Sequence, residues 1–74
     1  MRPGRATDAD ARAVVLQALR LFDTAAFRVD PKGPRFAALK AAERRGWVWF
    51  READRAAVTV DGQRAVADFM GARS

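Results

Sequence analysis

The chain has 74 residues, of which 14 are basic and 9 acidic, and its formal net charge is +5. This length provides one domain with a marginal core, because a domain of about 60 residues buries only about 60% of its unfolded surface. The chain has no cysteine and no histidine, so disulfides and a zinc site of Cys or His ligands are excluded as sources of stability. A homodimer, or another partner, is therefore expected.

Residues 1–6 predict a flexible basic N-terminal tail, and residues 7–74 predict a single domain. No signal-peptide core follows the basic start, and no stretch of about 18 apolar residues without charges is present. The sequence therefore predicts a cytoplasmic protein that does not cross a membrane.

The first predicted helix begins with Thr7 and Asp10, which have the spacing of a capping box, and runs to about Ala25. Apolar residues recur along it at four-three-four spacing, which is typical of a helix face that packs on a core. This predicted core stripe consists of Val15, Leu19, Phe22 and Ala26, with Leu16 and Ala18 alongside.

A short extended segment is expected at residues 27–29, and residues 30–33 have the proline and glycine positions of a type I turn. A second helix is predicted from Pro34 to Arg45, because proline suits the first helical position, and Gly46 should end it in the left-handed conformation. Phe36, Leu39 and Ala42 are expected on its buried side, and Ala37, Lys40, Ala41 and Arg44 on its exposed side.

Two strands are predicted at residues 47–51 and 56–60, joined by the four-residue hairpin loop 52–55. A final helix should follow, capped by Thr59 or Asp61 and ending at Gly71. Its apolar stripe is Val66, Phe69 and Met70. The expected fold class is α+β, with three helices and a two-stranded hairpin in the order α-α-β-β-α.

Two segments in this region share a pattern with a known family. In LKAAERRGWV, residues 39–48, a leucine-containing helix is followed by a glycine and two apolar residues that enter a strand. In VTVDG, residues 58–62, a threonine and a glycine three residues later mark the exit from the second strand. The chain from about Phe36 to Met70 thereby resembles the MarR-like and PadR-like winged-helix DNA-binding proteins. The resemblance implies a small winged-helix-like domain, in which the hairpin is the wing, and a function in transcription regulation. Such domains usually carry a further short helix before the recognition helix. Pro31 and Gly33 oppose a helix there, so the predicted helix-turn-helix is degenerate.

The basic charge is concentrated in the middle of the chain, where eight basic and four acidic residues lie between Arg28 and Arg55. In the helix 34–45, alanines lie beside cations, which suits a helix that lies in the major groove of duplex DNA. A solvated helix face would have the same composition, and structured RNA would match the charge equally well. The predicted DNA-binding residues are Arg35, Lys40, Arg44 and Arg45, with Arg2 and Arg5 as an N-terminal arm.

The hairpin supports an alternative function, because its first strand has apolar residues on both faces. Trp47 and Val48 are expected to lie in the core. Tryptophan, phenylalanine and arginine are also the residues that protein interfaces favour. The alternative is a protein-binding module or inhibitor, for example phage-encoded, that docks on a larger host protein. The residues expected to do so are Trp49, Phe50, Arg51 and Arg55.

An enzyme is not expected, since histidine, cysteine and tyrosine are absent and the one serine, Ser74, is terminal. The close carboxylate pairs at residues 8 and 10 and at residues 52 and 54 are explained by a helix cap and a turn. We expect no metal, cofactor or small-molecule substrate.

Overall fold

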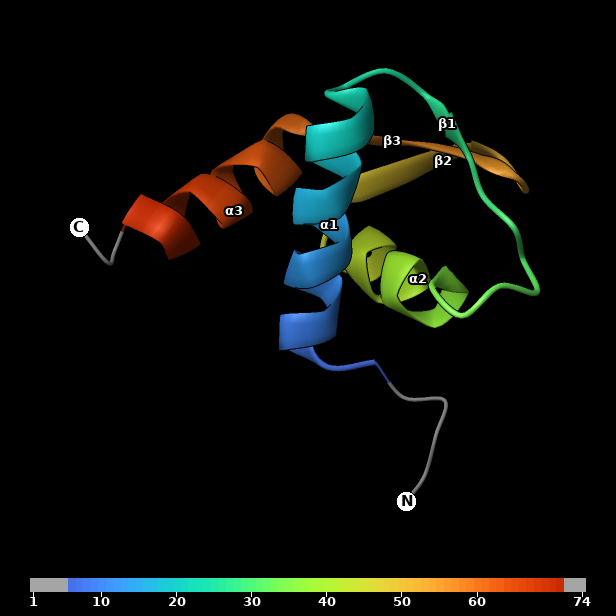
Figure 1. Ribbon diagram of the computed structural model, residues 1–74, viewed down its shortest axis with the longest axis horizontal. Helices are drawn as coiled ribbons and strands as arrows, with labels where there is room; N and C mark the ends of the chain where they lie inside the picture. Colours follow the sequence, from blue (N-terminus) through green and yellow to red (C-terminus); the bar gives the residue numbers. More distant parts are fainter. Residues whose placement is uncertain (1–5, 72–74) are drawn as a thin grey trace.

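The computed structural model describes the backbone of residues 6–71 and the side chains of residues 6–67. Its elements are α1 (Asp8–Phe22), β1 (Phe27–Arg28), α2 (Phe36–Arg44), β2 (Val48–Glu52), β3 (Arg55–Val58) and α3 (Val60–Gly71). In Figure 1, α1 stands at the centre, with α2 and the strands on one side and α3 projecting to the other. Three helices and an antiparallel sheet confirm the expected α+β class, and the expected α-α-β-β-α order holds with one short strand, β1, added between α1 and α2.

The sheet has one strand more than the predicted hairpin. The segment expected to be extended forms β1, which pairs with β3, so the strand order is β1-β3-β2. Phe27 lies opposite Ala56, and Arg28 lies opposite Arg55. The hairpin turn therefore lies beside the segment that links α1 to α2, and the Val29 N–H donates to the Asp54 carbonyl at 2.7 Å.

The start of α1 confirms the predicted capping box: the Thr7 N–H donates to Asp10 Oδ2 at 3.0 Å, and the Asp10 N–H donates to Thr7 Oγ1 at 3.1 Å. The helix ends at Phe22, before the expected Ala25, because Asp23 adopts a non-helical conformation with φ 56°. The expected stripe was wrong at its end, since Phe22 is 43% exposed and Ala26 is also exposed. The buried residues of α1 are Ala11, Val14, Val15 and Ala18.

The predicted turn at residues 30–33 is confirmed by the Gly33 N–H, which donates to the Asp30 carbonyl at 2.9 Å. Turn structure continues to residue 35, so α2 begins at Phe36 and not at Pro34. At its other end Gly46 has φ +80°, which confirms the left-handed glycine. Ala41 was expected on the exposed side but is buried, since α2 packs against both α1 and β2.

The hairpin is tighter than predicted, because Glu52 and Arg55 pair with each other and leave only residues 53–54 in the turn. The register is irregular between Phe50 and Glu52, because Arg51 forms a bulge and has no partner on β3. A bulge of this kind bends the strand and changes the direction of the side chain that it carries.

Thr59 is the cap of α3, and its hydroxyl accepts from the Gly62 N–H at 3.0 Å. The same hydroxyl donates to the Gly46 carbonyl at 2.5 Å, so it also joins the end of α2 to α3. Gly62 is buried against the chain at Trp47: a Cβ there would lie 2.9 Å from Val58 Cγ1 and 3.0 Å from the Trp47 carbonyl carbon. The approach of α3 to β2 and β3 therefore requires glycine at this position.

The core consists mainly of small side chains, and the largest that are fully buried are Val15 and Val48. Leu39 and Phe27 are 5% and 7% exposed, whereas Leu21, Trp49 and Val60 are more than half exposed. Ala6, assigned from the sequence to the tail, packs against this core. Within residues 6–71, no helix combines the length and the apolar content that a membrane crossing requires.

Candidate functional site

The predicted DNA-binding cations of the second helix point in different directions, and Arg45 points toward α1. Its Nε donates to Asp8 Oδ1 at 2.5 Å, and its Nη1 donates to the Ala41 carbonyl at 2.9 Å. Arg12 also contacts Asp8, at 3.5 Å. The guanidinium groups of Arg12 and Arg45 lie 5.1 and 5.7 Å from the Trp47 ring centre. Arg45 thus belongs to a charged cluster that connects the end of α2 to the start of α1.

Lys40 lies on the opposite side of α2, beside the hairpin. Its Nζ is 2.7 Å from Glu43 Oε1 and 4.6 Å from the ring centre of Phe50. Phe36 packs edge-on against Phe50, with ring centres 6.3 Å apart. The ammonium group is therefore positioned by an acidic neighbour and by aromatic rings, and its side chain remains 42% exposed.

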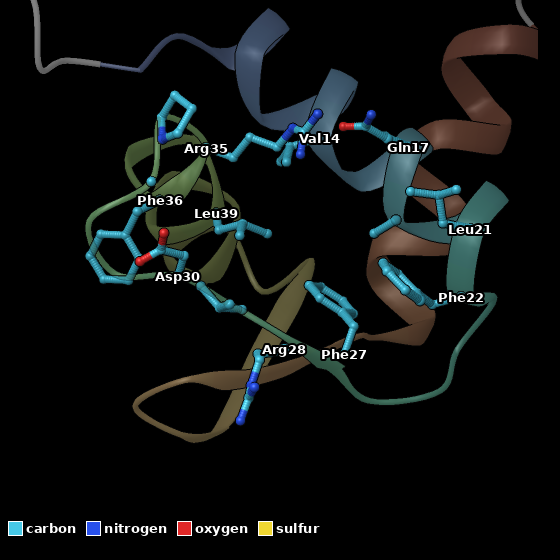
Figure 2. Close-up of a pocket in the computed structure, with 14 residues that line it drawn as sticks. Val14, Gln17, Leu21, Phe22, Phe27, Arg28, Asp30, Arg35, Phe36 and Leu39 are labelled. Carbon is cyan, nitrogen blue, oxygen red and sulfur yellow. The ribbon is translucent and has the colours of Figure 1, made fainter.

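Arg35 lies away from this face, at the N-terminal end of α2. Figure 2 shows its side chain extending toward Val14 and Gln17 of α1. It lines a groove of about 320 Å³ between α1, β1 and α2, whose apolar wall includes Phe22, Phe27 and Leu39. The groove lies beside residues 29–35, where the structure has turns and no helix.

The exposed face of α2 consists of Ala37, Lys40 and Arg44. Arg44 is exposed and forms no ion pair within the described part of the chain. We call these three residues the α2 face. Arg2 and Arg5, predicted as an N-terminal arm, lie outside the described residues.

A second cationic surface lies on the sheet. Pairing places Phe27, Val48 and Ala56 on the inner side, where all three are buried. Side chains alternate along a strand, so the neighbouring residues point outward. Arg28 points away from the groove in Figure 2. We call Arg28, Trp49, Arg51 and Arg55 the outer sheet face, where Arg51, at the bulge, is placed by its contact with the Trp49 ring. The small, buried Ala57 and the acidic Glu52 lie opposite Trp49 and Arg55 and belong to the same side of the sheet.

Trp49 is 51% exposed and is the aromatic residue of the outer sheet face. The Arg51 guanidinium lies 5.6 Å from its ring centre. Phe50, which the sequence predicts to bind a partner together with Trp49, points inward and packs, partly buried, against the core. The sequence correctly separates Trp47 and Val48, which pack at or in the core, from the exposed Trp49.

The sequence did not identify Arg28 as a site residue. It lies directly opposite Arg55 across the β1–β3 pairing, and both side chains are exposed. Apolar residues on both sides of Arg28 indicate that the arginine points outward. Only the pairing of β1 with β3 shows that its neighbour is Arg55. None of Arg28, Arg51 and Arg55 forms an ion pair within residues 6–67, although Glu52 lies opposite Arg55.

The described side chains include no group of His, Cys, Asp or Glu that could hold a metal ion. The two surfaces offer cations and one exposed indole ring for binding. Comparison of the chain with protein-family models, with curated proteins and with solved structures gives no match.

Proposed function

We propose that the protein binds duplex DNA through the α2 face, as a small winged-helix-like transcription regulator. The observation that carries this proposal is the placement of Lys40 and Arg44 beside the exposed Ala37. A small residue lets the helix backbone come close to the floor of the major groove, and the flanking cations then reach phosphates or guanine edges.

Arg45 and Arg35 have a smaller part in this proposal than the sequence predicted. Arg45 is held by Asp8, and Arg35 lies over the groove on the α1 side of the helix. Lys40 and Arg44 then supply the phosphate contacts, and affinity should fall as salt increases, with a contribution of about 0.9 per contact to the magnitude of the slope.

The test is the double variant Lys40→Ala with Arg44→Ala. The slope of log K against log salt is negative, and each lost phosphate contact should reduce its magnitude by about 0.9. Affinity for a labelled duplex, measured by fluorescence anisotropy at several salt concentrations, is expected to fall together with that slope.

The matched control is Arg20→Ala with Arg64→Ala, which removes two exposed arginines from α1 and α3 and changes the net charge equally. This control should bind nearly as the wild type does. If both double variants lose affinity to the same extent, binding follows net charge alone and α2 is not the recognition element.

A further inference from the structure

We propose that the outer sheet face binds single-stranded nucleic acid, with a base stacked on Trp49 and phosphates held by Arg28, Arg51 and Arg55. The α2 face is formed by other residues, so this proposal does not rest on duplex binding.

The first observation is an unfavourable arrangement of charge. Like charges directly opposite each other on neighbouring strands are destabilising, and Arg28 lies opposite Arg55. No acidic side chain of residues 6–67 forms an ion pair with either arginine. Glu52, which lies opposite Arg55 on β2, offsets one of the three positive charges, so the face keeps an excess of cations that an anionic partner would neutralise.

The second observation is the exposed indole ring of Trp49, which has Arg51 beside it at 5.6 Å. Flat aromatic rings and guanidinium groups are the surfaces on which unpaired bases stack. Bases inside a duplex are already stacked on each other, so this contact favours a single strand.

The size of the face argues against a protein partner. The longest strand, β2, has five residues, so three strands about 4.8 Å apart with a rise of about 3.4 Å per residue cover at most roughly 10 by 17 Å. A stable protein interface covers about 800 Å² on each partner and has an apolar centre. The outer sheet face has one large apolar side chain, Trp49. Its chemistry suits a few nucleotides better.

The test uses labelled thymidine DNA and uridine RNA strands of about 15 nucleotides, within the range of known single-strand sites. Binding of either strand should quench the tryptophan fluorescence, since a base stacks on Trp49. Trp49→Ala should weaken binding about tenfold and remove most of the quenching, whereas Trp49→Phe should retain most of the affinity.

A charge variant keeps the test independent of the fold around Trp49. Arg28→Gln with Arg51→Gln changes two exposed side chains and should lower the salt slope by about 1.4. Arg20→Gln with Arg64→Gln is the matched control and should leave the slope nearly unchanged. Circular dichroism of each variant checks that it is folded.

Three results would overturn the proposal. One is unchanged binding and quenching in the folded Trp49→Ala and Arg28→Gln/Arg51→Gln variants. Another is a duplex that competes as well as the single strand for the same residues. The third is displacement of the oligonucleotide by polyglutamate at equal charge, which would identify the face as a site for acidic protein segments.

Discussion

At the scale of single residues, Gly62 fixes how closely α3 approaches the hairpin. Alanine is normally the better helix former, by about 1 kcal/mol. Here the added Cβ would lie against Val58 and the backbone of Trp47. Backbone atoms cannot move aside as a flexible side chain can, so the clash should outweigh the gain in helix propensity.

We therefore expect Gly62→Ala to lower the free energy of unfolding by about 1–3 kcal/mol, the usual cost of overpacking. Urea denaturation followed by circular dichroism measures the change. Gln63→Ala, at the next and exposed position of α3, is the control and should be close to neutral. A Gly62→Ala protein more stable than the wild type would show that α3 moves away from Trp47 without cost.

At the scale of the elements, Asp8 connects α1 to the end of α2 through Arg45. Its side chain is 58% exposed, and exposed ion pairs contribute at most about 1 kcal/mol. The contribution of this pair to stability is therefore small. Its larger effect is on the direction of Arg45, which it holds away from the α2 face.

Asp8→Ala is expected to lower stability by less than about 1 kcal/mol. It should also free Arg45 for a phosphate contact, which would raise the salt slope of duplex binding by about 0.9. Anisotropy titrations of duplex DNA measure the slope. Asp61→Ala removes an acid from the first turn of α3 and is the matched control. An equal rise in both variants would attribute the effect to net charge.

Local patterns predicted most elements, because their causes lie within a few residues. The capping box at Thr7, the turn at residues 30–33 and the left-handed Gly46 were all confirmed. The pairing of β1 with β3 was not predicted, since residues far apart in the sequence form it. The direction of Arg45 likewise depends on Asp8, 37 residues away. The residue types of the candidate site could therefore be predicted from the sequence, but their arrangement in space could not.

At the scale of the whole molecule, the core is small and apolar side chains remain on the surface. Leu21 and Phe22 are 64% and 43% exposed at the end of α1, and both line the groove. A domain of this size gains proportionally more than a large one from burying such residues.

We expect the chain to self-associate at concentrations of about 100 μM, where even an interface of micromolar affinity is populated. Light scattering measures the mass. Leu21→Ser with Phe22→Ser should shift the population toward the monomer, whereas Val60→Ser, at an equally exposed position of α3, should not. A monomeric wild type at this concentration would contradict the expectation.

The double role of the Thr59 hydroxyl has a consequence for the opening of the native state. Thr59 accepts from the Gly62 N–H and donates to the Gly46 carbonyl, while its own N–H donates to the Trp47 carbonyl at 2.9 Å. If the first turn of α3 unwinds, the bonds of Thr59 to Gly62 and to Gly46 are lost together. The opening of this turn is therefore coupled to the end of α2 and to the start of the hairpin. Hydrogen exchange of the Thr59 and Gly62 amides should therefore give the same free energy of opening, as expected of one cooperative unit that opens together.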